Sequence, residues 1–224
     1  MMQHGGFAFI DDRYDYHLAV TDHFLAWYRQ PGKYVDPEHA PKFRYVGYPK
    51  GRAPSAADMK RPDKPVVLVA PTRRHAVLDD TIYQMIETCR SLFAKVAEVV
   101  VRLPRQDPKG AVFPQSDRSL DEDIRRATVV ITDMSTIVID ASGRGRPAVL
   151  YDYLSEPSFY AKEEMCVVVD NEVDLEREVS TLLTDPAAWA KEADRQRARF
   201  NAEIGWMDPS SVVQLIAENA ALRR

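Results

Sequence analysis

The fold is decided by the stretch TVVITDMST, residues 128–136. Its first five residues form an apolar, β-branched run, which is typical of a short strand buried on both faces of a sheet. A carboxylate and two hydroxyls follow, and the apolar residues after them predict a helix over 135–143 that ends at Gly143 or Gly145. The stretch therefore predicts a strand, a polar loop and a helix in succession, with the polar side chains where the strand ends.

The same alternation continues on both sides of this stretch. Apolar runs predict further strands at 66–69, 98–102, 148–151 and 166–169. Apolar residues and their spacing predict helices at 79–94, 120–127, 173–183, 186–200 and 209–222. Short apolar strands that alternate with helices predict βαβ units, and thus an α/β fold whose parallel sheet is flanked by helices on both faces.

Residues 1–62 differ in character, since they are rich in aromatic residues and lack this alternation. They predict a short helix over 21–28, capped by Thr21 or Asp22, and a strand at 43–46. The segment 50–64 carries prolines, glycine and several charges, as a linker does. We therefore expect two parts, 1–62 and 63–224, of which the second holds the sheet and the C-terminal helices.

Composition excludes several classes of protein. Of the 224 residues, 45% are hydrophobic and 29% are charged, which is typical of a globular protein rather than of a disordered chain. The net charge of −4 disfavours nucleic acid as a partner. No run approaches the roughly 18 apolar residues of a membrane span, and the N-terminus lacks the pattern of a signal peptide. The two cysteines, Cys89 and Cys166, have no metal-type spacing, so we expect a reducing cytoplasm and no zinc site.

Polar side chains that suit a phosphate follow three of the predicted strands. In a parallel sheet, ligands bind beyond the carboxyl ends of the strands, at the point where the strand order reverses. Arginine donates two parallel hydrogen bonds to a phosphate, and the first turn of a helix offers free N–H groups to an anion. We therefore expect a phosphate or pyrophosphate site at this edge. Its candidates are Thr72, Arg73 and Arg74 after the first strand, Arg102 after the second, and Asp133, Ser135 and Thr136 after the third.

Each of these residues also has a plainer structural role. Ser135 and Asp133 suit a helix cap, and Arg73 and Arg74 suit a solvated surface. Asp140 is a further candidate for the phosphate site, and its alternatives in mid-helix are to face solvent or to hold a turn together. What favours the site is position, because residues that follow neighbouring parallel strands meet at one edge of the sheet.

Several familiar motifs are absent from the sequence. It contains no G-x-G-x-x-G after a strand, no P-loop and no G-x-S-x-G elbow, which disfavours dinucleotide, P-loop and serine-hydrolase chemistry. The acidic clusters at 11–12 and 121–123 fit a solvated surface or a helix first turn better than a metal site. His4, in the segment QHGG at 3–6, is a candidate general base, and a plain surface histidine is the alternative.

Several segments of the chain, taken in order, resemble the CDP-glycerol glycerophosphotransferase family, which includes teichoic acid and capsule polymerases. The resemblance extends over most of the chain, and its longest match surrounds the T-D-x-S-[ST] pattern. The matching segments are QHG (3–5), DYHLAVT (15–21), VGYP (46–49), VLVAPTRR (67–74), DI with the alanine that follows (123–127), VITDMSTIVID (130–140) and GRPAVLY (145–151).

The resemblance implies a GT-B-like fold, of which this chain is the C-terminal, Rossmann-like half with a truncated acceptor-side part at 1–62. It implies a transferase that moves glycerol phosphate, or a related polyol phosphate or sugar, from a donor such as CDP-glycerol to a cell-surface polymer or glycan. His4 is then the base that activates the acceptor hydroxyl. No cofactor is expected, because the nucleotide-activated donor is itself a substrate. No metal-ligating residues are identified, and whether the reaction depends on a metal is left open. The resemblance implies that the donor is bound by Thr72, Arg74, Arg102, Asp133, Ser135 and Thr136. Arg73 and Asp140 are further candidates for this site from their positions in the sequence.

The sequence also departs from the family pattern. The family has a second histidine after the second strand of the donor domain, and the corresponding segment 102–104 has none. Arg73 stands where the family has an aromatic residue, and most of the family's acceptor domain has no counterpart here. The alternatives are a catalytically silent nucleotide-sugar-binding module, a fragment that needs a partner chain or oligomer, and an epimerase or hydrolase of nucleotide sugars. We expect a cytoplasmic protein, with attachment to the inner membrane face left open.

Overall fold

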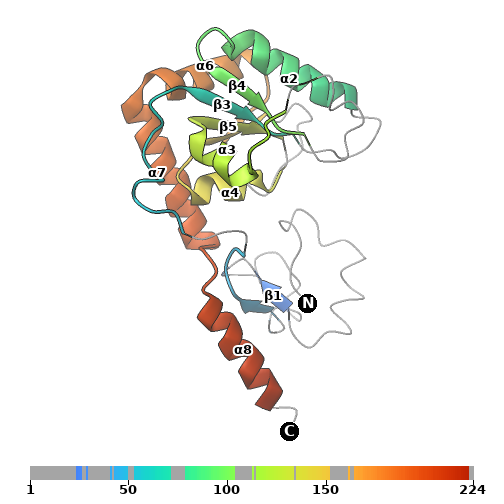
Figure 1. Cartoon of the computed structure of the whole chain (residues 1–224), viewed down its shortest axis with the longest axis vertical. Helices are drawn as coiled ribbons and strands as arrows, with labels where there is room; N and C mark the ends of the chain where they lie inside the picture. The colour runs from blue at the N-terminus through green and yellow to red at the C-terminus, as the bar shows by residue number, and fades with distance from the viewer. Residues whose placement is uncertain are drawn as a thin grey trace. The chain divides into compact units, whose positions relative to one another are not determined.

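The computed structural model describes residues 24–26, 29, 41, 43–49, 53–71, 79–103, 113, 115–133, 135–151, 161 and 164–221 (Figure 1). The chain divides into two compact units. The larger is Pro54–Arg199, and the smaller combines Met1–Ala53 with Phe200–Arg224. Helix α8 (Pro209–Ala221) belongs to the smaller unit.

The larger unit contains the expected five-stranded parallel sheet. Its strand order is β4-β3-β5-β6-β7, and every neighbouring pair runs parallel. Three strands are buried along their whole length, as their apolar β-branched runs predict. The predicted α/β fold class is therefore confirmed. The strands are β3 (Val66–Val69), β4 (Glu98–Val101), β5 (Val129–Thr132), β6 (Ala148–Tyr151) and β7 (Val167–Val169).

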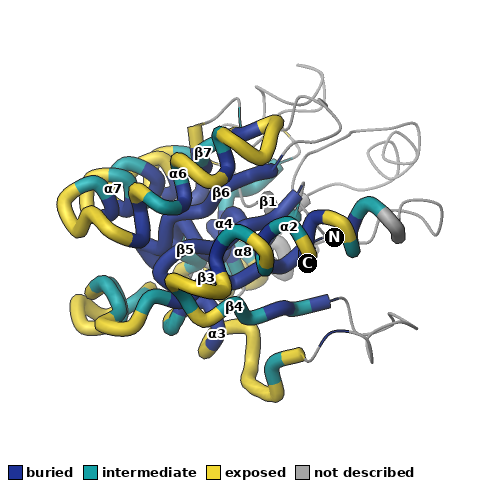
Figure 2. The backbone as a smooth tube through the Cα atoms, turned by 90° about the horizontal axis from the view of Figure 1, so that it is seen from above, coloured by how far each residue is buried: buried dark blue, intermediate teal, exposed yellow. Residues whose placement is uncertain are grey.

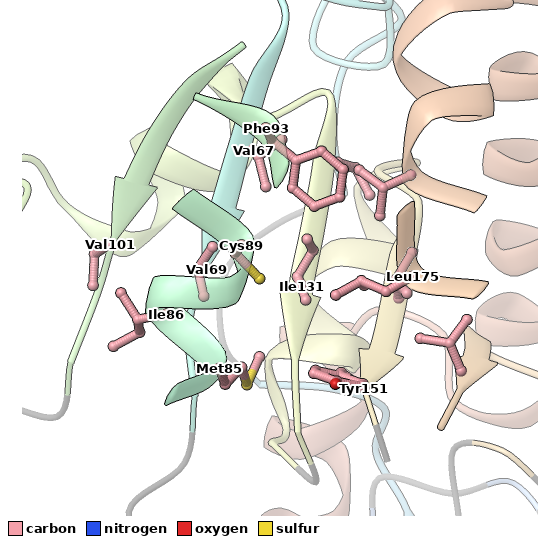
Figure 3. Close-up of a cluster of buried hydrophobic side chains, with 14 of the residues drawn as sticks. Val67, Val69, Met85, Ile86, Cys89, Phe93, Val101, Ile131, Tyr151 and Leu175 are labelled. Carbon is pink, nitrogen blue, oxygen red and sulfur yellow. The ribbon is translucent and has the colours of Figure 1, made fainter. Parts of the chain in front are cut away.

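Helices cover both faces of this sheet (Figure 1). Since successive residues of a strand point to opposite faces, Val67, Val69 and Ile131 join the core beneath α2, α6 and α7, as Figure 3 shows for α2. The adjacent strand residues Leu68 and Val130 point to the opposite face, which α3 and α4 cover, and they are also fully buried. The helices are α2 (Asp79–Phe93), α3 (Leu120–Arg126), α4 (Ile137–Gly143), α6 (Glu172–Thr184) and α7 (Pro186–Glu203).

Burial follows this layering along the chain. The strands in the middle of the sheet are dark blue in Figure 2, whereas buried and exposed positions alternate along α6 and α7. In α6, Leu175, Val179 and Leu182 are buried at helical spacing, so one stripe of the helix faces the core. The central strands of the sheet are therefore held by helices on both faces.

The smaller unit corrects one expectation. The predicted helix over 21–28 is wrong, because β1 (Phe24–Ala26) is a strand that pairs in parallel with β2 (Phe43–Tyr45). An isolated helix of eight residues is marginal in water, so pairing with a distant strand decides the local structure. The same unit includes a second parallel bridge, in which Tyr48 N–H donates to Gly205 and Met207 N–H donates to Tyr48.

The predicted linker is also corrected over the part that the structure describes. Ser55 and Asp58 form a hydrogen-bonded turn, in which the Ser55 hydroxyl donates to the Asp58 carboxylate at 2.7 Å. The carbonyl of Asp58 accepts a 2.6 Å bond from the buried Arg146, and Arg61 donates to the carbonyl of Leu183. The segment is thus part of the larger unit, held by residues far away in the sequence.

We expect both cysteines to resist thiol reagents until the protein unfolds. Burial raises the pKa of the Cys89 and Cys166 thiols to about 12. At pH 8, DTNB should label neither thiol in the native protein and both in guanidinium. The raised pKa also fixes the sign of the pH dependence: the contribution of these thiols to stability is full below their unfolded pKa and is lost as the pH rises toward 12. Fast labelling of the native protein would contradict this prediction.

Candidate functional site

The strand order places a topological switch point between β3 and β5. The chain leaves β3 for β4 on one side and then crosses to β5 on the other, so the carboxyl ends of β3 and β5 border the position where ligands bind in such sheets. Backbone hydrogen bonds hold the ends of neighbouring strands in register. The N–H of Ala70 donates to the carbonyl of Ile131, and the N–H of Arg102 donates to the carbonyl of Val69, both at 2.9 Å. The Thr132 hydroxyl adds a 2.6 Å bond to the carbonyl of Ala70.

Arg102 lies at this edge, directly after β4. Its Nη1 donates to the Asp123 carboxylate at 2.6 Å and to the carbonyl of Arg118 at 2.7 Å. The Arg102 side chain is 23% exposed, whereas that of Asp123 is 1% exposed. A charged hydrogen bond to a buried carboxylate is one of the stronger polar contacts in proteins, so the guanidinium is held in one orientation.

Asp133, Ser135 and Thr136 follow β5 at the same edge. Asp133 is buried, and its carbonyl accepts a 2.6 Å bond from the N–H of Ser135. Helix α4 begins at Ile137 with Thr136 as its N-cap residue, so Ser135 and Thr136 precede the helix and do not form its first turn. The Ser135 hydroxyl accepts from the N–H of Ile137 at 3.4 Å, and both hydroxyl residues stay partly exposed.

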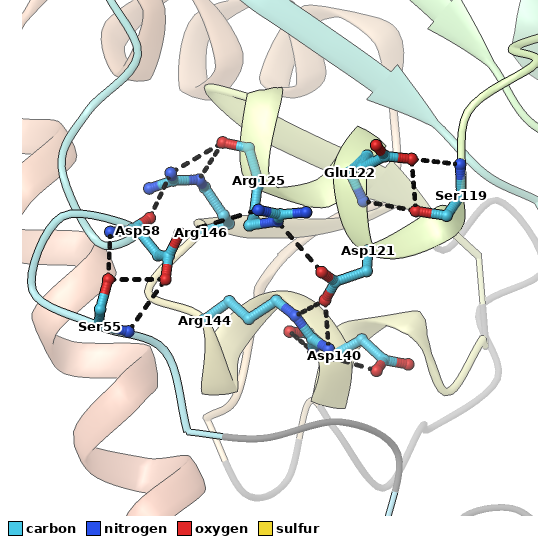
Figure 4. A network of polar contacts seen from close by, with 9 residues as sticks. All are labelled: Ser55, Asp58, Ser119, Asp121, Glu122, Arg125, Asp140, Arg144 and Arg146. Carbon is cyan, nitrogen blue, oxygen red and sulfur yellow. Dashed lines mark hydrogen bonds and ion pairs between the residues drawn. The ribbon is translucent and has the colours of Figure 1, made fainter.

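Asp140 lies within α4, where it pairs with Arg144 at 3.2 Å (Figure 4). Both side chains are 8% exposed. Arg144 also donates to the carbonyl of Asp140 at 3.0 Å and to Asp121 of α3 at 2.7 Å. Of the two structural alternatives for Asp140, this geometry favours the one in which it holds the end of the helix together.

The acidic run 121–123 occupies the first turn of α3, as its plainer interpretation expects, and its three residues differ in their roles. Asp121 pairs with Arg125 and Arg144 (Figure 4). Glu122 completes a capping box with Ser119, and the hydrogen bond from the Ser119 hydroxyl lowers the pKa of its carboxyl. Asp123 alone is buried and faces Arg102. Sequence reasoning missed this residue, although the isoleucine after it already pointed to the core.

The remaining candidates lie outside the described residues. They are His4, Thr72, Arg73 and Arg74, together with the acidic pair at 11–12. Within the described ranges, no group of three or more His, Cys, Asp and Glu side chains is placed to hold a metal ion. The structure therefore brings Arg102, Asp133, Ser135 and Thr136 to one edge of the sheet.

Comparison with solved structures shows which proteins share this fold. The wall teichoic acid polymerase TagF superposes with a TM-score of 0.61 at 15% identity, over 94% of this chain and 61% of TagF. A putative UDP-N-acetylglucosamine 2-epimerase from Listeria monocytogenes superposes with a TM-score of 0.55 at 15% identity, over 82% of this chain and 58% of the epimerase. The spinosyn rhamnosyltransferase SpnG superposes with a TM-score of 0.51 at 17% identity, over 78% of this chain and 51% of SpnG.

These similarities concern the fold, because all three identities are low. The chain spans about three fifths of the length of TagF, its first structural neighbour. One TagF structure was solved after a soak with CDPG. No family model and no curated protein matches the sequence. Among the helices that the structure describes, none is long and apolar enough to cross a membrane.

Proposed function

We propose that this chain takes part in transferring glycerol phosphate, or a related polyol phosphate or sugar, from a nucleotide-activated donor such as CDP-glycerol to a cell-surface polymer or glycan. The observation that carries the proposal is the strand order, which gathers Arg102, Asp133 and Ser135 around a topological switch point. Support comes from the fold, which is shared with a teichoic acid polymerase and a glycosyltransferase.

In this proposal the donor pyrophosphate lies at the carboxyl ends of β3 and β5. An acceptor hydroxyl attacks the β-phosphorus of the donor, or the anomeric carbon of a sugar donor. A new bond to the acceptor oxygen forms as the bond to the nucleotide breaks, and the acceptor proton passes to a general base, for which His4 is the candidate. Arg102 stabilises the negative charge that grows on the leaving nucleotide.

The proposal also names partners and a place of action. The donor is a substrate, and no cofactor is invoked. We propose that a partner chain or a second copy of this chain supplies part of the acceptor side, since the chain matches only 61% of TagF. The proposed place of the reaction is the cytoplasmic face of the membrane.

A second candidate function is a nucleotide-sugar-binding module without turnover. The segment 102–104 favours it, because it lacks the second histidine of the family that the sequence resembles. Both functions require the same donor site, so binding tests the site and turnover separates the two.

Calorimetric titration with CDP-glycerol, CDP, UDP and UDP-sugars tests the site. We expect one nucleotide class to bind, and Arg102→Lys to weaken binding about tenfold, because lysine keeps the charge near Asp123 but loses the planar fork. Ser135→Ala should weaken it less. Arg177→Ala is the matched control, since Arg177 pairs with Asp174 and Glu178 on the exposed side of α6. Absence of binding to every nucleotide would overturn the proposal.

Turnover is then tested with His4→Ala. For a transferase this variant should lose product formation and keep donor affinity, since a general base contributes to the rate and not to the binding of the donor. If the wild-type chain binds the donor but forms no product with any acceptor half supplied, the binding module is the better description.

A further inference from the structure

Asp123 is buried at a position where an acidic residue is costly. Its side chain is 1% exposed, whereas that of Asp121, two residues earlier in the same turn of α3, is 49% exposed. Each Asp123 oxygen has one side-chain partner: Oδ2 accepts from Arg102 at 2.6 Å, and Oδ1 accepts from the Ser116 hydroxyl at 2.8 Å. A buried ion pair adds little net stability compared with an apolar pair, so its geometry is the more informative property.

The contacts of Arg102 are all made by one nitrogen. Nη1 has two hydrogens, and its two partners, Asp123 Oδ2 and the carbonyl of Arg118, account for both. These partners come from α3 and from the loop before it, so the plane of the guanidinium is fixed from two directions. Among the described residues, Nε and Nη2 have no hydrogen-bond partner.

The unused edge has the chemistry of a phosphate receptor. The N–H groups of Nε and Nη2 point the same way in a guanidinium and form two parallel hydrogen bonds to phosphate oxygens. Arg102 directly follows β4, which is the neighbour of β3 in the sheet, so this residue belongs to the same rim as Asp133 and Ser135. Ser116 and Arg118 extend the support, since the Arg118 N–H donates to the Ser116 hydroxyl at 3.2 Å.

We propose that Asp123 is a positioning residue that holds Arg102 with its Nε–Nη2 edge toward the diphosphate of the bound nucleotide. The inference rests on the proposed function and names the group through which the diphosphate is recognised. Asp123 itself does not touch the ligand. Its carboxylate fixes Nη1, and the fixed guanidinium binds without first losing its rotational freedom.

The experiment compares a nucleoside diphosphate with its nucleoside, using CDP with cytidine or UDP with uridine according to what the wild-type chain binds. Asp123→Asn should weaken diphosphate binding about tenfold and leave nucleoside binding unchanged, since only the phosphates contact Arg102. Ser116→Ala should weaken diphosphate binding two- to threefold. Asp121→Asn is the matched control, because it removes an acid from the same turn that pairs with Arg125 and Arg144 and not with Arg102.

The outcomes separate this inference from the function on which it rests. If the wild-type chain binds no nucleoside diphosphate, the proposed function and the inference fall together. If it binds one and the Asp123 and Ser116 variants bind equally well, the inference is wrong and the proposed site stands. Equal losses for diphosphate and nucleoside would also overturn it, because they indicate a general disturbance. Circular dichroism reports the folding of each variant, and Ser116→Ala decides the question if Asp123→Asn does not fold.

Discussion

Trp189→Ala is expected to lower the free energy of unfolding of the larger unit by about 3–5 kcal/mol. Trp189 is 5% exposed and belongs to the core beneath the sheet. Its indole N–H donates to the carbonyl of Thr128 at 2.7 Å, just before β5 begins. The guanidinium of Arg146 lies 5.8 Å from the centre of one of its rings. The substitution therefore leaves a large cavity and an unpaired carbonyl in the same place.

Denaturant unfolding followed by far-ultraviolet circular dichroism measures this loss. Trp189→Phe should lose less, because it keeps most of the buried aromatic surface and gives up only the N–H and one ring. Val173→Ala is the control for a large apolar residue on the surface, since Val173 is 74% exposed, and it should change stability by less than about 0.5 kcal/mol. A stability of Trp189→Ala close to that of the wild type would show that α7 does not hold β5.

Arg144→Ala is expected to destabilise the larger unit by about 3–5 kcal/mol, because it breaks a buried ion pair with Asp140 and removes a buried side chain. Arg144 is 6% exposed and contacts both the carboxylate and the carbonyl of Asp140. The pair closes the C-terminal end of α4, whose seven residues are all buried. Since Ser135 and Thr136 directly precede this helix, loss of the pair should also disturb the candidate site.

A double variant distinguishes the effect of the broken ion pair from that of lost packing. Asp140→Leu combined with Arg144→Met removes both charges and keeps much of the volume, so it should be more stable than Arg144→Ala alone. Arg177→Ala, which breaks an exposed pair on α6, should leave the unfolding midpoint within experimental error. If the double variant were less stable than Arg144→Ala, packing and not charge would explain the effect.

The sequence predicts the sheet well because its strands carry a local signal. The runs at 66–69, 129–132 and 148–151 are buried on both faces, so nearly every residue in them is apolar and the pattern survives without tertiary information. Helix α6 was equally predictable, since one apolar stripe of the helix faces the core. Parallel pairing of neighbouring strands then placed Arg102, Asp133 and Ser135 at one edge.

The features that sequence reasoning did not capture depend on distant partners. β1 is a strand because Phe43–Tyr45 pairs with it, and nothing within 21–28 carries that information. The segment 54–62 has the composition of a linker but is held by Arg146 and the carbonyl of Leu183. Asp123 belongs to an acidic run whose other two members are exposed, so only its packing against Arg102 sets it apart.

The discontinuous make-up of the smaller unit bears on how the protein forms during synthesis. The larger unit is one uninterrupted segment, whereas the smaller unit needs Phe200 and the residues after it to join Met1–Ala53. At translation rates of about 5–20 residues per second, the residues from Phe200 onward are synthesised on the order of ten seconds or more after Met1–Ala53. The bridge between Tyr48 and Trp206 therefore cannot form until the larger unit has been translated. Assembly of the smaller unit is thus the later of the two events during synthesis.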